Sequence, residues 1–235
     1  MDIEVCVASF ESLELCKKYK SDRVELCQNL SSGGLTPSPS LVRKSLDLGL
    51  ETHVLIRPRP GDFCYSDSEK TQMLSDIVFY QKMGVAGIVV GALSSTRELD
   101  LSFLKQIRIL TPGIELTFHK AFDDLLNWKP AMDALIGIKY NRILTAGCSS
   151  NVFKGIHTIK EMMLYANRNI QILPGGGIRL DNIQRVILEL NPEAIHFSAT
   201  QKEHYSNSNY FKAQELRINE DLIKNLFELS RGDKS

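Results

Sequence analysis

The chain lacks several features that would place it in a special class of proteins. Its 28 Lys and Arg residues balance its 28 Asp and Glu residues, so no net charge favours a nucleic acid or a membrane surface as partner. No apolar run approaches the roughly 18 residues that cross a membrane, and the acidic start at Met1–Glu4 is unlike a signal peptide. We therefore expect a soluble protein with neither nucleic-acid nor membrane partners.

Cysteine is scarce, and its spacing is not that of a disulfide framework. The 5 cysteines form an odd count, and no two of them are spaced as Cys-x-x-Cys. This composition predicts free thiols in a reducing compartment, and therefore a cytoplasmic protein.

What the chain does contain is a repeated alternation of apolar and polar residues. Glu4 and Cys6 share one face of the first predicted strand, opposite its apolar residues, and Glu25 and Cys27 do the same in the second. Alternation is clear in six of the eight predicted strands. The predicted strands are Ile3–Val7, Val24–Cys27, His53–Arg57, Gly87–Val90, Glu115–His119, Arg142–Thr145, Ile170–Ile172 and Ile195–Ser198.

A segment with helical spacing follows each strand, which implies right-handed βαβ units and a parallel sheet. The predicted helices are Glu11–Tyr19, Ser40–Leu48, Ser68–Met83, Leu101–Leu110, Lys129–Ile136, Val152–Ala166, Asp181–Leu190 and Asp221–Leu229. Eight such pairs favour an α/β fold with one closed (β/α)₈ TIM barrel over residues 1–235, rather than a doubly wound sheet. Helices outside the barrel would cover the apolar faces, so the polar faces would point inward.

Three of the predicted loops that follow strands are long. They are Gln28–Ser38, Pro58–Asp67 and Thr200–Asn219, the last of which we expect to be irregular. Loops at the C-terminal ends of barrel strands build the sites of (β/α)₈ enzymes, so these loops are expected to cover a ligand, although long loops also vary without function.

Arg57 and Arg59 leave the third strand separated by a proline. Proline restricts its own φ and biases the preceding residue to extended geometry, which would order both guanidinium groups. Ordered arginines suit carboxylate or phosphate ligands. The alternative is a set of salt bridges, from Arg57 to Glu4 or Glu25 and from Arg59 to Asp62.

Two histidines at strand ends are candidates for the site. His119 ends the fifth strand and Asp123 follows in the same loop, so His119 could transfer a proton while Asp123 orients it or a substrate hydroxyl; it could equally be an interior histidine. His196 shares a face with Ser198 in the eighth strand, where a structural role and a ligand contact both remain open.

The glycine run Gly175, Gly176 and Gly177 lies between the seventh strand and a helix. Backbone N–H groups of glycine can approach an anion closely, and barrels often bind phosphate here, although a tight turn explains the run as well.

Cys6 and Cys27 lie on neighbouring predicted strands, whose backbones run about 4.8 Å apart. Two thiols on one face could share Cu(I), a soft ion that favours thiolates. The alternative is that both are small buried apolar residues. Glu4 and Glu25 on the same face argue against a purely apolar setting, and Glu25 is also a candidate for proton transfer.

These motifs together resemble the CutC family of copper homeostasis proteins. The similar segments are residues 23–27, 33–38, 57–67, 117–123, 142–147, 175–179 and 195–199. The resemblance implies a cytosolic (β/α)₈ barrel, a homo-oligomer in many members, that is associated with copper tolerance or copper binding. The positions that it implies for the site are Glu25, Cys27, Arg57, Arg59, His119, Asp123 and His196.

Two functions are consistent with these patterns. The first is copper homeostasis with Cu(I) bound by Cys6 and Cys27. The second is an enzyme that acts by acid–base chemistry on a small phosphorylated or carboxylated metabolite, because paired arginines and a glycine anion cradle suit an anionic ligand better than a cation.

Overall fold

Eight parallel strands form the centre of the molecule. The structure, a computed structural model, describes residues 1–204 and 214–232. The strands are β1 (Asp2–Val7), β2 (Arg23–Leu26), β3 (Thr52–Leu55), β4 (Gly87–Val89), β5 (Glu115–Phe118), β6 (Arg142–Thr145), β7 (Gln171–Pro174) and β8 (Ala194–Phe197). Their spatial order is β7-β6-β5-β4-β3-β2-β1-β8. A parallel bridge from Gly175 to His196 joins the two end strands and closes the ring, so the predicted barrel is confirmed.

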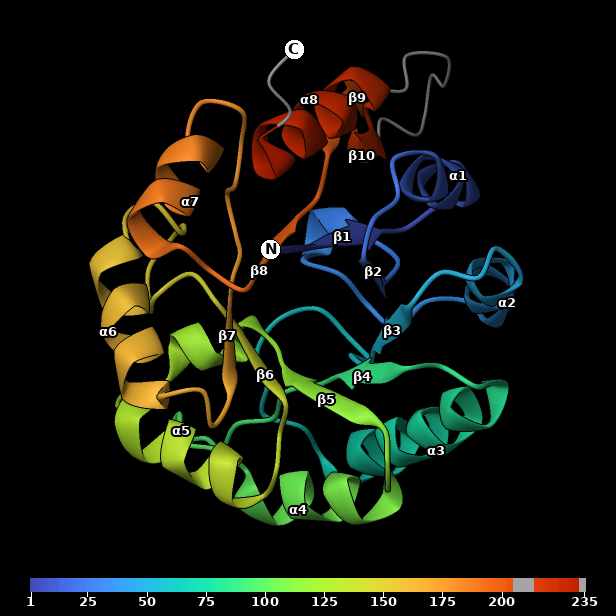
Figure 1. Ribbon diagram of the computed structural model, residues 1–235. Helices are drawn as coiled ribbons and strands as arrows, with labels where there is room; N and C mark the ends of the chain where they lie inside the picture. The colour runs from blue at the N-terminus through green and yellow to red at the C-terminus, as the bar shows by residue number, and fades with distance from the viewer. Residues whose placement is uncertain (205–213, 233–235) are drawn as a thin grey trace.

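Helices surround the strands as an outer ring (Figure 1). They are α1 (Phe10–Lys18), α2 (Pro39–Asp47), α3 (Asp67–Met83), α4 (Leu101–Leu110), α5 (Trp128–Gly137), α6 (Ile156–Ala166), α7 (Ile183–Leu190) and α8 (Glu220–Arg231), with short 3₁₀ turns η1 (Leu30–Ser32) and η2 (Lys120–Asp124). All eight predicted helices are present, and the start of α6 differs most, because turns occupy residues 152–155.

Local sequence signals set several helix ends. Ser66 and Glu69 form a capping box at the start of α3, in which each side chain accepts a hydrogen bond from the other residue's backbone N–H. Asp100 caps α4 through the backbone N–H of Phe103. Gly84 ends α3 in the left-handed conformation, which costs glycine little.

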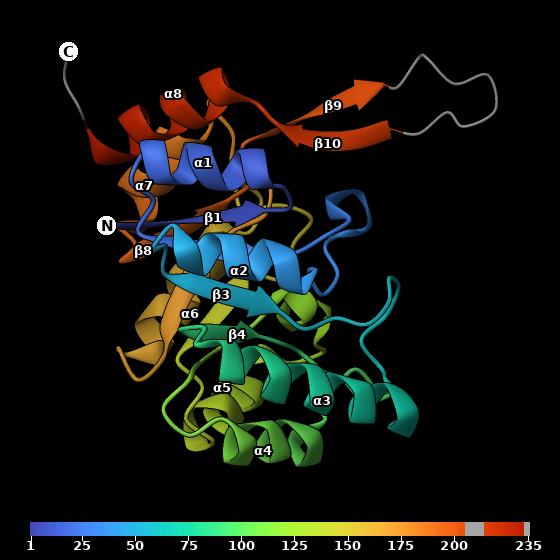
Figure 2. The same ribbon diagram turned by 90° about the vertical axis from the view of Figure 1, so that its right-hand side faces the viewer.

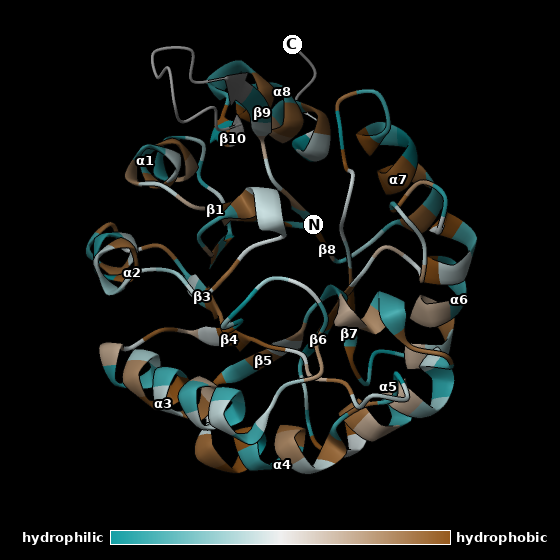
Figure 3. Ribbon diagram, turned by 180° about the vertical axis from the view of Figure 1, so that it is seen from behind, coloured by the Kyte–Doolittle hydropathy of each residue, from teal (hydrophilic) through white to brown (hydrophobic). Residues whose placement is uncertain are grey.

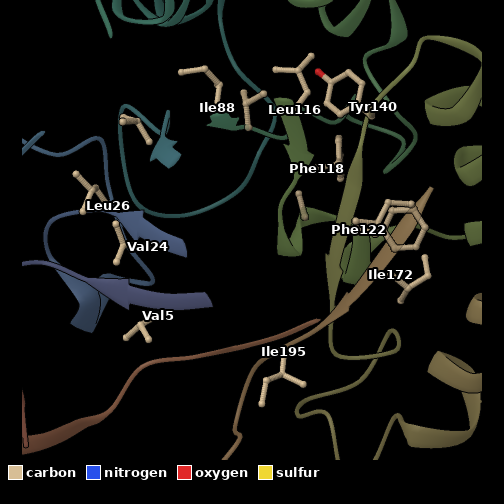
Figure 4. Packing of buried hydrophobic residues seen from close by; sticks show 14 of the residues in the cluster. Val5, Val24, Leu26, Ile88, Leu116, Phe118, Phe122, Tyr140, Ile172 and Ile195 are labelled. Atoms are coloured by element: carbon tan, nitrogen blue, oxygen red, sulfur yellow. The ribbon is translucent and has the colours of Figure 1, made fainter. Parts of the chain in front are cut away.

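The main hydrophobic core lies between the strands and the helices. Apolar residues of one strand parity are buried there, and Figure 4 shows labelled members arranged around the ring of strands, among them Val5, Val24, Ile88, Leu116 and Ile195. The outer helices carry both hydrophobic and hydrophilic residues, as expected for helices that bury one face (Figure 3). The polar residues, which alternate with these apolar ones along the strands, therefore point into the barrel interior.

The segment after β8 differs from the sequence expectation. It was expected to be irregular over residues 200–219, but β9 (Thr200–His204) and β10 (Gln214–Ile218) pair as antiparallel strands. The expected loop also included residues 205–213, which lie outside the described residues. Figure 2 shows this pair projecting on the same side as the C-terminal ends of the strands. Both strands are rich in polar residues, so they lacked the apolar face that marked the barrel strands.

Candidate functional site

A cavity of about 210 Å³ opens at the C-terminal ends of the strands, where the site of a barrel was expected. The residues that line it are Cys6, Glu25, Leu30, Gly33, Leu55, Arg57, Phe63, His119, Lys120, Leu144, Gly176, Gly177, Ile178, Arg179, His196, Phe197 and Ser198. Side chains from most of the barrel strands thus converge on one space.

Cys6 and Cys27 face each other inside the barrel. Cys6 pairs with Glu25 in the β1–β2 register, and the backbone N–H of Cys27 donates to the carbonyl of Val7. The two Sγ atoms are 3.5 Å apart, with no disulfide between them. The hydrogen bond with Cys27, burial and the charge of Glu25 all raise the pKa of the Cys6 thiol. The register, which the sequence left open, brings these thiols together.

Glu4 is fully buried, and it is held by two cationic side chains. Its Oε1 lies 2.6 Å from Nδ1 of His196, and its Oε2 accepts from Nε of Arg23. Burial alone would raise the pKa of Glu4, but the hydrogen bond and charge of His196 and the charge of Arg23 lower it. Because an ionised carboxylate only accepts hydrogen bonds, Nδ1 of His196 is the donor.

His196 therefore presents its other ring nitrogen away from Glu4. Burial would lower its pKa, but Glu25, Cys6 and Glu4 together raise it. Ligand atoms of Cys6, Glu25 and His196 all lie within 4.8 Å of one another. The three side chains could thus contact one small ligand or ion.

Glu25 is a second buried carboxylate in the same group. Its Oε1 is 3.8 Å from the Cys6 sulfur, whereas Oε2 has no hydrogen-bond partner among the described residues. Burial raises the pKa of Glu25 to about 7; the charge of Glu4 adds to this shift and that of His196 opposes it. Glu25 can therefore exchange a proton near neutral pH.

His119 directly follows β5 and lines the cavity, whereas Cys6 and Glu25 reach it from β1 and β2. Its Nδ1 accepts from the backbone N–H of Ala121 at 3.1 Å, so the neutral ring carries its proton on Nε2. Nε2 is buried and has no partner among the described residues. Burial, with a contribution from the charge of Arg57, lowers the pKa of His119 to about 3. His119 is thus a neutral hydrogen-bond donor.

No hydrogen bond joins Asp123 to His119 among the described residues, so the orienting role expected from the sequence has no support in these contacts. The carboxylate of Asp123 accepts from the backbone N–H groups of Ala146 and Cys148 and from the hydroxyl of Thr145. These bonds fix the loop after β6. Asp123 also lies 3.7 Å from Nζ of Lys120, which does line the cavity.

The two arginines after β3 are placed differently from each other. Arg57 lines the cavity, but its terminal nitrogens donate to the carbonyls of Ser32, Gly34 and Gly61, which ties the loops after β2 and β3 together. It forms no salt bridge with Glu4 or Glu25 among the pairs described.

Arg59 is not among the residues that line the cavity. It pairs with Asp62 at 3.0 Å, as one alternative from the sequence expected, and also with Glu69. Of the two arginines, only Arg57 is therefore brought to the cavity.

The glycine run lies at the cavity edge, next to a lysine that was not predicted. Gly176 and Gly177 line the cavity with φ values of +95° and +81°, whereas Gly175 leaves room for Leu144 and His196. A Cβ atom on Gly176 would lie 2.8 Å from Nζ of Lys120, so the ammonium group lies against the glycine backbone. The only sequence signal for Lys120 was its place directly after a strand-end histidine.

A further polar group occupies the N-terminal end of the barrel. His53 lies between Glu51 and Glu115, with its Nε2 3.6 Å and 3.5 Å from their carboxylates. Arg23 and Arg142 pair with these same carboxylates. Because two guanidinium groups already neutralise the carboxylates, this layer is better suited to structure than to a cation.

Comparisons with known proteins identify the family. The model of the CutC family matches residues 1–201. The chain belongs to the CutC family. A CutC family protein of Glaesserella parasuis is 37% identical over 200 residues, covering 85% of this chain and 82% of that protein. A human protein named copper homeostasis protein cutC homolog is 36% identical over 200 residues, covering 84% of this chain and 72% of its own length.

Solved structures agree with the CutC assignment. A crystal structure of a CutC protein from Streptococcus agalactiae has a TM-score of 0.79 and 33% identity, covering 83% of this chain and 97% of that one. A structure of phosphoribosylanthranilate isomerase from Thermotoga maritima, at 14% identity and a TM-score of 0.61, shares the barrel fold. Within the described part of the chain, no helix is both long and apolar enough to span a membrane.

Proposed function

We propose that this member of the copper homeostasis family binds one Cu(I) ion between Cys6 and Cys27. The observation that carries the proposal is the 3.5 Å separation of the two sulfur atoms inside the barrel. Metal–sulfur bonds of about 2.3 Å allow two sulfurs to share an ion when they are up to roughly 4.6 Å apart. The two thiols satisfy this limit without movement of the strands.

Two thiol sulfurs and an imidazole nitrogen are ligands that suit a soft ion, and because the pKa of Cys6 is raised, the ion must displace the thiol proton on binding. Thiolates select Cu(I), and His196 could supply Nε2 as a third ligand once that nitrogen loses its proton, since its Nδ1 is already committed to Glu4. A hydrogen bond from the far side of a ligating imidazole is the usual way in which its orientation is fixed.

The charge of the site is compatible with a bound cation despite the nearby Arg57. When the two thiols bind Cu(I) as thiolates they release two protons, and the ion with its two thiolates carries a net charge of about −1. A neighbouring guanidinium or imidazolium group would therefore attract the filled site rather than repel it.

A competition titration tests the proposal. Under anaerobic conditions the protein is mixed with a coloured Cu(I) chelator, and the Cu(I) withdrawn from the chelator is measured. We expect one Cu(I) per chain for the wild type, and at least a tenfold weaker affinity in the Cys6→Ser, Cys27→Ser double variant. Cys16→Ser is the matched control, because Cys16 is also a free buried cysteine but lies in the main core on α1. Unchanged stoichiometry and affinity in the double variant would show that the ion binds elsewhere.

A second candidate function is proton-transfer catalysis on a small anionic metabolite. The specific observation in its favour is that Oε2 of Glu25 and Nε2 of His119 have no hydrogen-bond partner among the described residues, and both residues line one cavity. Buried polar groups without partners are costly, so a ligand that contacts both would be stabilised. Glu25 would transfer the proton and His119 would donate a hydrogen bond to an oxygen of the substrate.

The second candidate is tested with a panel of small phosphorylated and carboxylated metabolites. A compound that raises the melting temperature is then assayed for turnover. We expect Glu25→Gln to lower kcat by about 10²–10⁴, as is typical when a proton-transfer group is removed. Glu98→Gln, in an exposed loop away from the cavity, is the control and should retain the rate. Full activity in Glu25→Gln would exclude this role.

A further inference from the structure

The part of the cavity next to the glycine run differs in charge from the part next to the cysteines. Lys120 and Arg179 line it together with Gly176 and Gly177, and these residues come from the loops after β5 and β7. Cys6 lies on β1, Glu25 on β2 and Cys27 directly after β2, so the acidic and thiol side is built from other strands than this basic side.

The glycine loop offers backbone donors that the fold leaves unused. The carbonyl of Gly176 accepts from the N–H of Val152 at 2.8 Å, and the carbonyl of Gly177 accepts from Nδ2 of Asn182 at 2.9 Å. No described residue accepts a hydrogen bond from the N–H of either glycine. The loop is therefore held through its carbonyls, while its N–H groups remain available to an anion.

The two cations are poorly neutralised by the protein. Among the described residues, Lys120 pairs with the carboxylate of Asp123, at 3.7 Å, whose oxygens are already occupied by Thr145 and by two backbone N–H groups. The guanidinium group of Arg179 contacts only the carbonyl of Ile178, at 3.4 Å, within the described part of the chain. Both cations can thus turn to an anionic ligand.

An independent observation indicates that the cavity accepts a polar ligand. His119 is 6% exposed and Glu25 is 5% exposed, yet Nε2 of the first and Oε2 of the second accept or donate no hydrogen bond among the described residues. The charged group next to Oε2 of Glu25 is Nδ1 of His196, at 3.9 Å. One is a donor and the other can accept or donate, so together they match a hydroxyl or carbonyl group on the body of a ligand.

We propose that Lys120, Arg179 and the N–H groups of Gly176 and Gly177 bind the phosphate group of a small phosphate monoester, whose remaining atoms extend toward His119 and Glu25. A phosphate offers three terminal oxygens and close to two negative charges, which match two cations and two N–H donors better than a carboxylate does. The extension toward His119 and Glu25 rests on the second candidate function, but the phosphate subsite does not.

Arg57 is not part of this subsite. Its terminal nitrogens are already bonded to three carbonyls of the loops after β2 and β3, so its guanidinium group orders those loops. In this proposal Lys120 and Arg179 bind the anion, in place of the paired arginines that the sequence suggested.

The test uses inorganic phosphate as the probe and needs no turnover. Amide NMR signals of the wild-type protein are recorded with increasing phosphate at constant ionic strength, with chloride as the counter-titration. We expect the signals of Gly176 and Gly177 to shift with phosphate only. Lys120→Gln should weaken the apparent affinity by at least about tenfold, as expected for a charged hydrogen bond. Lys129→Gln, which removes the same charge from α5 outside the cavity, should leave it unchanged.

The possible outcomes distinguish a failure of the phosphate subsite from a failure of the proton-transfer function. If the two glycine signals do not move, or move equally in Lys120→Gln, the phosphate subsite is wrong. If they move as expected but Glu25→Gln keeps full turnover of a phosphorylated compound, the subsite stands and the proton-transfer role fails. Phosphate binding should persist in the Cys6→Ser, Cys27→Ser variant, because no cysteine takes part.

Discussion

Because His119 stays neutral in the folded protein, it should lower the free energy of unfolding as the pH falls, and His119→Asn should remove this contribution. Its pKa is about 3 in the folded protein, compared with 6.5 for an unperturbed histidine. Between these values the unfolded chain binds a proton that the folded chain does not, so stability is lost as the pH falls below 6.5. From pH 7.5 to pH 5.0 this amounts to about 2 kcal/mol, at about 1.4 kcal/mol per pH unit below the unfolded pKa.

The matching experiment is urea unfolding of the wild type and His119→Asn at several values between pH 5.0 and 7.5. The asparagine side-chain oxygen can still accept the N–H of Ala121, but it does not titrate. The variant should therefore lack the loss of about 2 kcal/mol, although its stability at pH 7.5 can differ by a constant amount. His157→Asn, at an exposed position of α6, should follow the wild-type curve. Parallel curves for the wild type and His119→Asn would refute the burial argument.

Two further substitutions test the packing of the barrel. Gly87→Ala should destabilise the protein by about 1–3 kcal/mol in urea unfolding, because its Cβ would lie 2.2 Å from Nδ1 of His53. Gly137→Ala is the control and should be close to neutral, because no atom lies within 4 Å of its Cβ. Equal effects of the two substitutions would contradict this account. Arg57→Lys should accelerate amide hydrogen exchange in the loops after β2 and β3, since lysine cannot reproduce the forked bonds to three carbonyls. Arg59→Lys, a more exposed change, should leave exchange in the loop after β2 unaltered.

The sequence predicted the barrel and the direction of its inner side chains, because a period of two is a local property of each strand. The alternation in β1 and β2 was enough to place Glu4 and Glu25 inside, and the structure confirms this. The β9–β10 pair was missed because its residues carry no apolar stripe, and pairing between two polar strands leaves no local signal.

The composition of the site was harder to predict, because contacts between distant loops depend on register and side-chain direction. Arg57 and Arg59 look equivalent in the sequence, yet one faces the cavity and the other pairs with Glu69 on α3. Lys120 lies beside Gly176 only because the loops after β5 and β7 meet at the mouth of the barrel. No spacing within the chain encodes that contact.

The central claim, that Cu(I) binds between Cys6 and Cys27, is tested most directly by X-ray absorption at the copper edge of the protein loaded with one equivalent of Cu(I). The account predicts two sulfur scatterers at about 2.3 Å in the wild type, as for thiolates on comparable ions. It also predicts that both are kept in the Cys16→Ser control and lost in the Cys6→Ser, Cys27→Ser double variant. A wild-type spectrum fitted by nitrogen and oxygen neighbours alone, or sulfur neighbours that survive in the double variant, would contradict it.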